Sequence, residues 1–206
     1  MAVLKGTQTE KNIMLAFAGE SQARNRYTFF AGRARKDGFD AIAKIFVETA
    51  DQEKEHAQRL FNLLEGGDLE ITAAFPAGKV GTTLENLLAA AFGEHEENTV
   101  MYPKFAQIAA SEGFGAIAET LKHIGYAERY HESRFRALAD AIEKGTLFKQ
   151  PNVVMWRCTN CGNWHIGTEA PEVCSACAHP RGHFISEGTI SHCDTNEGFC
   201  EYTKID

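Results

Sequence analysis

The sequence predicts a mainly α-helical protein, with a four-helix bundle followed by a small domain built around four cysteines. A Glu-x-x-His motif occurs twice, at 53–56 and at 128–131. Similar segments precede the two copies, DGFDAIA at 37–43 and EGFGAIA at 112–118. Two Cys-x-x-Cys pairs follow, where helical periodicity has stopped. The repeat indicates two related helix pairs, and the cysteine pairs indicate a separate metal site.

The first helix pair is bounded by residues that end helices. We expect one helix over about 8–35, ending at the KDG turn of 36–38, and a second over about 39–64, ending at two glycines. Residues 66–81 then form a connection longer than an antiparallel hairpin needs. A connection of this length fits the crossover between the two halves of a ferritin-like bundle.

The second helix pair has a clear start. Thr82 and Glu85 have the spacing of a capping box, which predicts the beginning of the third helix. This helix is expected to end near Gly113, and the fourth is expected over about 114–143. Residues 144–152 form a linker. The domains are therefore expected over 1–146 for the bundle and 153–206 for the cysteine-containing part with a C-terminal extension.

The repeat between the two halves has one irregularity. Tyr27 and Tyr102 are 75 positions apart, whereas Glu20 and Glu94 are 74 apart, so one extra residue lies between Glu94 and Tyr102. Helices commonly absorb a single insertion as a π-bulge, and such bulges cluster at functional sites. We therefore predict a π-bulge near 95–102, assisted by Pro103, which lacks a backbone donor.

The Glu-x-x-His motifs predict a site for two metal ions. Residues three apart share one face of a helix, so the glutamate and histidine of each motif can bind the same metal pair. A further glutamate lies upstream of each motif, on the preceding helix. Carboxylate oxygens and imidazole nitrogens suit iron or manganese. The candidate ligands in the bundle are Glu20, Glu53, His56, Glu94, Glu128 and His131.

Glu97 is an additional candidate, three residues after Glu94. It is either an ordinary exposed acid or a fifth carboxylate of the site. If it points inward, a ferric ion favours its negative charge and a ferrous ion favours neutral His56, so the two can exchange during a redox cycle. Tyr27 and Tyr102 lie two turns beyond the upstream glutamates. There a phenol can donate to a ligating carboxylate or to a bound peroxide, or it can pack in the core.

Other residues of the bundle are assigned to packing. His95 and His123 have no placement that favours a ligand, and we expect them on the surface or in the core. The expected apolar core includes Phe17, Phe46, Leu60, Leu88 and Leu121.

The cysteine pairs predict one tetrahedral metal site formed by Cys158, Cys161, Cys174 and Cys177. Their spacing is equally compatible with zinc and with iron. Gly162 gives the backbone freedom to turn around the first pair, and Trp156, Trp164 and Phe184 are expected to form a small core around the thiolates. Because so short a segment has little core, the metal is expected to hold the fold. Cys193 and Cys200 are free thiols, a disulfide or further ligands with His192.

Composition limits the possible partners. The chain has 28 acidic and 21 basic residues and a formal charge of −7, which argues against nucleic acid. No run of eighteen apolar residues occurs, so no membrane partner is expected. Thiols kept for metal suit a reducing compartment, and we expect a cytoplasmic location.

With both candidate sites in view, residues 8–185 resemble the rubrerythrin family, which joins a ferritin-like di-iron bundle to a rubredoxin-like domain. The resemblance rests on the six bundle ligands, on Glu97 and on the four cysteines. It implies that Glu53 and Glu128 bridge two irons. It also implies that Glu20 with Glu97 or His56 completes one iron, and that Glu94 with His131 completes the other. Tyr27 and Tyr102 resemble tyrosines that support the ligands in the family.

The resemblance also implies an activity. It implies iron at the four cysteines, and reduction of hydrogen peroxide to water as a defence against oxidative stress in an anaerobe or microaerophile. Electrons would come from a rubredoxin or a reductase, pass through the thiolate-bound iron and reach the di-iron site. A homodimer or higher homo-oligomer is expected. The ligands alone also permit a ferroxidase that handles iron, or a non-catalytic electron carrier or sensor. Zinc at the cysteines would favour both of these alternatives.

Overall fold

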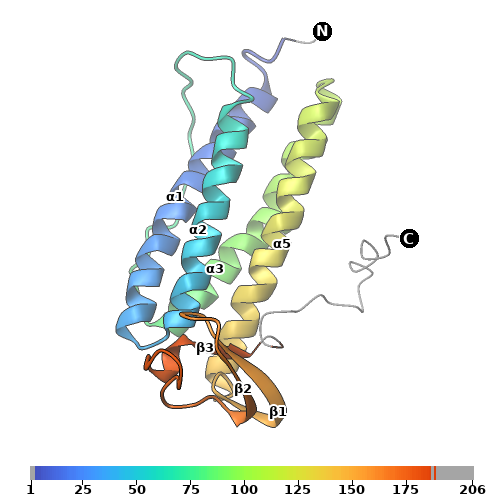
Figure 1. Ribbon diagram of the computed structural model, residues 1–206. Helices are drawn as coiled ribbons and strands as arrows, with labels where there is room; N and C mark the ends of the chain where they lie inside the picture. The colour runs from blue at the N-terminus through green and yellow to red at the C-terminus, as the bar shows by residue number, and fades with distance from the viewer. Residues whose placement is uncertain (1–2, 187, 189–206) are drawn as a thin grey trace, which may run out of the picture. The chain divides into compact units, whose positions relative to one another are not determined.

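The computed structural model of the protein describes residues 3–186 and residue 188 (Figure 1). The chain divides into two compact units, residues 1–132 and 133–206. Cys193 and Cys200, together with His192, lie outside the described residues.

The first unit contains the helices of a bundle, which run alongside one another in Figure 1. Helices α1 (Gln8–Lys36) and α2 (Asp40–Phe61) form the first pair. Helix α3 (Thr83–Glu96), a π-helix η1 (Glu97–Met101) and α4 (Tyr102–Ser111) follow without a break. Helix α5 (Gly115–Glu143) begins in this unit and continues into the second. The mainly helical, ferritin-like fold predicted from the sequence is therefore confirmed.

The boundaries of the second helix pair agree with the signals in the sequence. The capping box is present: the hydroxyl of Thr82 accepts from the amide of Glu85, and the carboxylate of Glu85 accepts from the amide of Thr82 at 2.7 Å. The predicted π-bulge is also present, as η1, and Pro103, which has no backbone donor, follows it directly in the first turn of α4. The extra residue is thus absorbed just after Glu94.

Two carboxylates join the ends and beginnings of helices in a reciprocal way. Asp37, at the end of α1, accepts from the amide of Thr83 at 3.0 Å and from its hydroxyl at 2.7 Å, at the start of α3. Glu112, at the end of α4, accepts from the amide of Thr9 at 2.8 Å and from its hydroxyl, at the start of α1. Asp37 and Glu112 occupy equivalent positions of the repeat, so each half of the bundle caps the other.

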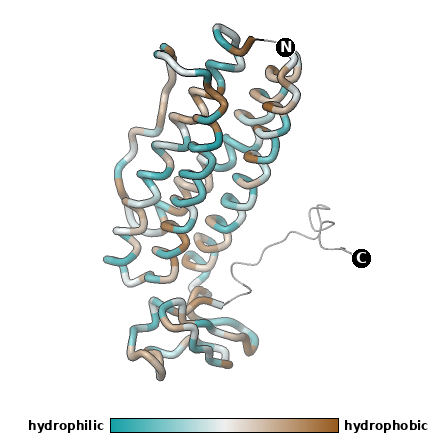
Figure 2. Tube along the Cα trace, turned by 45° about the horizontal axis from the view of Figure 1, so that its top comes forward, coloured by the Kyte–Doolittle hydropathy of each residue, from teal (hydrophilic) through white to brown (hydrophobic). Residues whose placement is uncertain are grey.

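The bundle core contains most of the residues expected there, with one error. Phe46, Leu60 and Leu121 are fully buried, and Phe17 is half-buried against the core. Leu88 is 43% exposed, so its assignment to the core was wrong. The inward face of α3 is formed by residues such as Leu87, and a neighbour on a helix points about 100° away. Figure 2 shows hydrophobic and hydrophilic residues mixed along each helix in this way.

The second unit contains a three-stranded antiparallel sheet in the order β2-β1-β3. Its strands are β1 (Lys149–Cys158), β2 (Trp164–Glu169) and β3 (Phe184–Ser186), with a short 3₁₀ turn, η2 (Arg181–His183), before the last. Trp156 and Phe184 are buried beside the cysteines, as predicted. Trp164 is 61% exposed, contrary to the prediction. It pairs with Arg157 on β1, and side chains alternate along a strand, so it lies on the face opposite Trp156 and Cys158.

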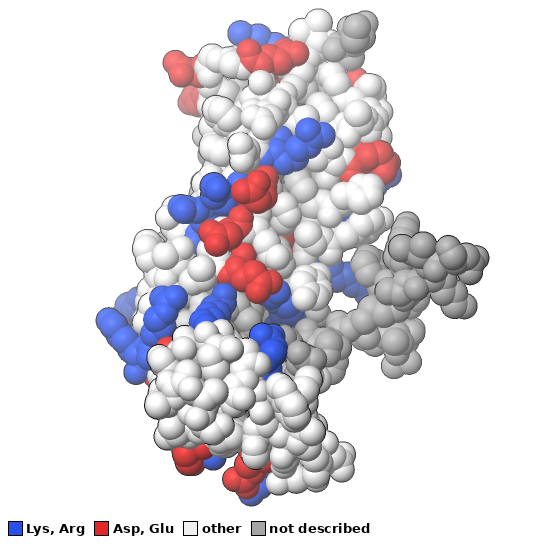
Figure 3. All heavy atoms as spheres, in the orientation of Figure 1, with Lys and Arg blue, Asp and Glu red and all other residues white. Residues whose placement is uncertain are grey.

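Among the described residues, no helix combines the length and the apolar character needed to cross a membrane. On the face drawn in Figure 3, acidic side chains lie between basic ones along the helices, so charges of both signs share this surface.

The carboxylate of Asp37 should contribute measurably to stability, because it satisfies donors at the start of α3. Replacing Asp37 by alanine is expected to lower the free energy of unfolding by about 1–2 kcal/mol, measured by urea denaturation. The exposed Asp140, which pairs with Lys144 in the next turn, provides the control. Asp140→Ala should change the free energy by less than about 0.5 kcal/mol. Equal effects of the two substitutions would contradict the role given to Asp37.

The same contribution should depend on pH. Burial opposes the charged form of Asp37, but hydrogen bonds from Thr83 and Arg33 outweigh it and lower the pKa of the carboxyl. The folded state therefore binds this proton less tightly than the unfolded state. The difference between wild type and Asp37→Ala should be complete above about pH 4 and should shrink as the pH falls below it.

Candidate metal centres

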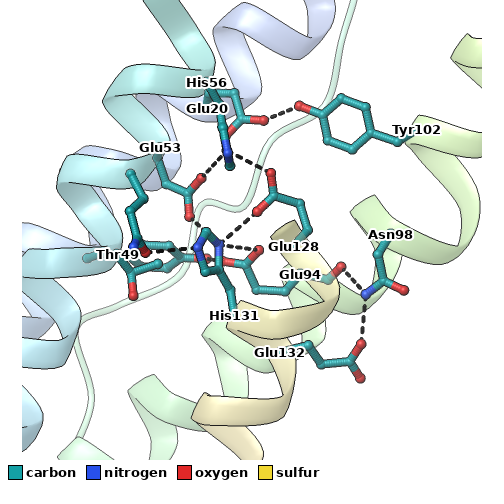
Figure 4. A network of polar contacts seen from close by, with 12 residues as sticks. Glu20, Thr49, Glu53, His56, Glu94, Asn98, Tyr102, Glu128, His131 and Glu132 are labelled. Carbon is teal, nitrogen blue, oxygen red and sulfur yellow. Dashed lines mark hydrogen bonds and ion pairs between the residues drawn. The ribbon is translucent and has the colours of Figure 1, made fainter. Parts of the chain in front are cut away.

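Four helices direct acidic and imidazole side chains to one place inside the bundle (Figure 4). Helix α1 contributes Glu20, α2 contributes Glu53 and His56, α3 contributes Glu94, and α5 contributes Glu128 and His131. The four glutamates are at most 1% exposed. Charged residues are almost never buried so completely unless they are paired or bind metal.

These side chains form two groups of four potential ligands. One group is Glu20, Glu53, His56 and Glu128, and the other is Glu53, Glu94, Glu128 and His131. Within each group the ligand atoms lie within 4.8 Å of one another. Glu53 and Glu128 belong to both groups, which is the arrangement expected of carboxylates that bridge two ions. The structure therefore brings together all six bundle residues that the sequence proposed.

The close contacts within the groups have the character of a metal site. Nδ1 of His56 lies 2.9 Å from Glu128 Oε1, and Nδ1 of His131 lies 2.7 Å from Glu128 Oε2. Yet these two oxygens and Nδ1 of His131 have no hydrogen-bond partner of good geometry, and the same is true of one oxygen each of Glu20, Glu53 and Glu94. Buried polar atoms without partners are rare in folded proteins. Atoms that converge without bonding one another fit two divalent cations held at their centre.

The charges of the site strongly perturb its acids and bases. Burial, and then the charges of Glu128 and Glu53, raise the pKa of Glu20 well above its usual value. Burial and the charge of Glu53 raise the pKa of Glu94 to about 8. For His56 burial acts in the opposite direction, but contacts with Glu128 and Glu53 outweigh it and raise the pKa to about 9. Without metal, protons would therefore compensate part of the negative charge that cations compensate when bound.

Two buried tyrosines hold the outer carboxylates in a reciprocal arrangement. The hydroxyl of Tyr27 donates to Glu94 Oε1, and the hydroxyl of Tyr102 donates to Glu20 Oε1 (the latter in Figure 4). Each tyrosine thus supports the glutamate of the other half of the repeat. Burial, followed by the charge of the bonded glutamate, raises the pKa of both phenols, so they remain protonated donors. Both side chains thus have the contact with a carboxylate that was one of the alternatives left open by the sequence.

Glu97 lies beside the two groups but belongs to neither. It is the first residue of η1 and is half-buried. Its Oε1 lies 4.0 Å from where a Cβ would stand on Gly19, in the residue before Glu20. Its charge is among the causes that raise the pKa of Glu20 and of Tyr27. The π-helix therefore places Glu97 next to the site, while His56 occupies the fourth position of one group.

Polar residues around the ligands were not identified from the sequence. Gln52 Oε1 lies 3.0 Å from Nε2 of His131 and orients that ring. The amide of Asn98 donates to the backbone carbonyl of Glu94 and to Glu132, both at 2.7 Å. Glu132 also contacts His95 Nδ1 at 3.0 Å, so His95 has a defined partner. The only signal in the sequence was position, since each of these residues is a neighbour or one turn away from a ligand.

The second unit brings the four cysteines together as free thiols. The Sγ atoms of Cys158 and Cys177 are 3.8 Å apart, and those of Cys161 and Cys174 are 3.7 Å apart. Four sulfurs at about 2.3 Å from a tetrahedral ion are separated by roughly 3.8 Å, so the spacing fits such an ion. Iron and zinc share this geometry, and the distances do not distinguish them.

Both cysteine pairs lie on similar turns. The amide of Gly162 donates to the carbonyl of Cys158, and the amide of Ala178 donates to the carbonyl of Cys174, each at 2.9 Å. Gly162 and Ala178 both have positive φ angles, of 79° and 57°. Gly162 therefore has the left-handed conformation that was expected of it, while the second turn reaches the same region with an alanine. A backbone hydrogen bond from His179, larger than the opposing effect of burial, lowers the pKa of Cys177 to about 6, which favours the thiolate.

Fold and sites together define the class of protein: a ferritin-like bundle with a carboxylate and histidine site for two metals, carrying a four-thiolate domain. Models of known families match the same two regions, the one described as rubrerythrin over residues 11–139 and the one described as rubrerythrin, rubredoxin-like domain, over residues 156–185. The chain belongs to the rubrerythrin family.

Relatives cover nearly the whole of this chain. Rubrerythrin of Nitratidesulfovibrio vulgaris is 59% identical over 184 residues, which are 89% of this chain and 96% of the relative. Rubrerythrin of Porphyromonas gingivalis is 54% identical over 181 residues, 88% of this chain and 90% of the relative. Among solved structures, nigerythrin in a mixed-valence state is similar with a TM-score of 0.60 and 30% identity, covering 89% of this chain and 88% of that one.

Removing the metals should make stability depend on pH in a defined direction. The pKa values of Glu94 and His56 are raised, so in the metal-free protein the folded state binds their protons more tightly than the unfolded state does. Their contribution to stability is present at low pH and is lost as the pH rises through about 8 and about 9. Thermal unfolding of chelator-treated protein should therefore shift to lower temperature between pH 5 and pH 9. Protein loaded with Fe²⁺ or Mn²⁺ should shift less, and equal shifts would argue against metal at these carboxylates.

Proposed function

We propose that the protein is a peroxidase that reduces hydrogen peroxide to water, with two electrons and two protons used for each molecule of peroxide. The observation that carries the proposal is the presence, in one chain, of a paired four-ligand site and a four-thiolate site. The paired site suits a two-electron reduction. A thiolate centre without an open coordination position suits the delivery of single electrons.

We further propose iron at both sites. The donor set of carboxylates and imidazoles suits iron in the bundle, and four thiolates accept iron as well as zinc. A related structure supports this choice, since nigerythrin has been described in a fully reduced, all-ferrous state. It is 30% identical to this chain with a TM-score of 0.59.

In this proposal each ligand has a separate task. Glu53 and Glu128, which belong to both groups, would be shared by the two metals. Glu20 with His56 would complete the ligands of one metal, and Glu94 with His131 those of the other. Iron held by these residues would supply the two electrons that reduce hydrogen peroxide. Tyr27 and Tyr102 would hold Glu94 and Glu20 in place through the hydrogen bonds that their hydroxyl groups donate.

Glu97 and His56 are proposed to exchange at one metal position during the cycle. His56 has its Nδ1 directed at Glu53 and Glu128, while Glu97 stands outside the group. This is the arrangement expected for the reduced, less positively charged metals. After oxidation the added positive charge favours the carboxylate of Glu97. Gly19 leaves room for that carboxylate beside α1.

The proposal includes a source of electrons and a cellular setting. A rubredoxin or a reductase is the expected donor, and the protein is expected to act as a homodimer or higher homo-oligomer in the cytoplasm. Free thiols at the four described cysteines support a reducing compartment. A ferroxidase that only handles iron has no need of the four-thiolate site, which is why the peroxidase is preferred.

Peroxide should oxidise both centres of the reduced protein. Under anaerobic conditions, adding hydrogen peroxide to the fully reduced, iron-loaded protein should restore the visible colour of a ferric thiolate centre, with about one peroxide consumed per two electrons. Cys174→Ser should remove this colour and stop multiple turnovers with an external donor, while the bundle iron still reacts once. Ser175→Ala, which keeps all four thiolates, provides the control. No colour in any oxidation state of the wild type would favour zinc at the cysteines and an iron-handling role.

Substitution of Glu97 distinguishes the peroxidase hypothesis from the hypothesis that the protein only takes up iron. Because the carboxylate is needed to stabilise the oxidised metals, Glu97→Ala should lower steady-state peroxide reduction by about 10–100-fold. Uptake of ferrous iron, measured by titration of the metal-free protein, should persist. Glu96→Ala is the matched control, since Glu96 is exposed and adjacent. An unchanged rate in Glu97→Ala would refute the exchange of ligands.

A further inference from the structure

The ligand histidines of the two halves of the bundle, His131 and His56, differ in their neighbours and in their exposure to solvent. Gln52 Oε1 lies 3.0 Å from Nε2 of His131, the ring nitrogen that faces away from the carboxylates. The side chain of His131 is 3% exposed. The position equivalent to Gln52 in the other half, 75 residues later, is Ala127, which has no hydrogen-bonding side chain. The side chain of His56 is 17% exposed. Solvent therefore reaches His56 but is almost completely excluded from His131.

A shallow surface pocket of about 550 Å³, widely open to solvent, lies at His56. Helix α2 contributes Arg59, and α5 contributes Glu119, Thr120, His123 and Ile124. Arg59 Nη2 donates to Thr120 Oγ1 at 3.3 Å and so spans the two helices across this pocket. The imidazole of His56 forms part of its wall, and its Nδ1 lies 2.9 Å from Glu128. One aromatic ring therefore separates the pocket from the carboxylates of the metal site.

We infer that this pocket admits hydrogen peroxide to the bundle metals, an inference that rests on the proposed peroxidase function. Peroxide is small and uncharged, and each of its oxygens both donates and accepts hydrogen bonds. Arg59, Thr120 and His123 offer polar groups of matching kind along the pocket.

A bulky residue at the pocket tests the route. In Thr120→Trp the indole would fill the space between Arg59 and His123. Thr28→Trp is the matched control, because both threonines are helical and donate to the carbonyl four residues earlier, Thr120 at 3.1 Å and Thr28 at 3.0 Å. Two rates would be measured by stopped-flow absorption: azide binding to the oxidised, iron-loaded protein, and peroxide oxidation of the reduced protein. Iron content and thermal unfolding would verify that each variant is intact.

Thr120→Trp should slow both azide binding and the peroxide reaction by about tenfold or more, while Thr28→Trp leaves both unchanged. Wild-type rates of azide binding in Thr120→Trp would overturn the inference. The azide measurement does not require turnover. If the wild type fails to reduce peroxide, yet Thr120→Trp still blocks azide, the peroxidase proposal fails and the pocket remains the route for small molecules.

Arg59→Ala gives a second test that does not depend on a bulky residue being tolerated. Arg59 is exposed, so its loss should not affect folding. Removing this positive charge should slow the binding of the azide anion by about threefold or more at low salt, and should weaken the dependence of that rate on ionic strength. The reaction with uncharged peroxide should change by less. If Arg59→Ala slowed azide and peroxide equally, or left the rate of azide binding unchanged, small molecules would have to reach the bundle metals by another route.

Discussion

The structure depends on the burial of four carboxylates in the middle of a helical bundle. Glu20, Glu53, Glu94 and Glu128 are almost inaccessible to water, and several of their oxygens have no hydrogen-bond donor. Burying unpaired charges costs several kcal/mol for each ion even after relaxation. Such a cluster persists only if cations or protons compensate it. The metals are therefore part of the electrostatics of the folded bundle as well as of its chemistry.

Residues of each half of the repeat support the buried carboxylates and the helix ends of the other half. Each tyrosine supports the glutamate of the opposite half, Tyr27 with Glu94 and Tyr102 with Glu20. At the ends of the helices, Asp37 and Glu112 cap the opposite half in the same manner. Neither helix pair has a complete site or complete caps without the other. Reciprocal contacts of this kind fix the relative position of the helices, and the ligand geometry depends on that position.

Sequence alone predicted the parts of the fold that follow from local spacing. The Glu-x-x-His motifs, the capping box at Thr82 and the extra residue after Glu94 each have a fixed local consequence, and the structure contains all three. Leu88 and Trp164 were assigned to the core wrongly. Hydrophobic character states that a residue can be buried, but adjacent apolar residues compete for one face, and only the packing of the whole element decides between them.

The contacts missed in the sequence were those between distant segments. Gln52 reaches His131 across 79 positions, and Asn98 reaches Glu132 across 34. No spacing rule connects such pairs, because they depend on how the helices are aligned. An internal repeat makes such contacts easier to predict, because a contact known in one half can be looked for at the equivalent positions of the other half.

The differences between the halves are where function is expected, because a perfectly repeated bundle would make its two metal positions equivalent. The π-helix adds Glu97 to one half only. Gln52 covers His131, while Ala127 leaves His56 open to a pocket. Both differences concern the group that contains Glu20 and His56: His56 lines the pocket, and Oε1 of Glu97 lies 4.0 Å from the place of a Cβ on Gly19, next to Glu20. Under the proposed exchange of Glu97 and His56, the metal position with an alternative ligand would also be the one that a small substrate can reach. The position formed by Glu94 and His131 is the more enclosed of the two, because the side chain of His131 is 3% exposed and that of His56 is 17% exposed.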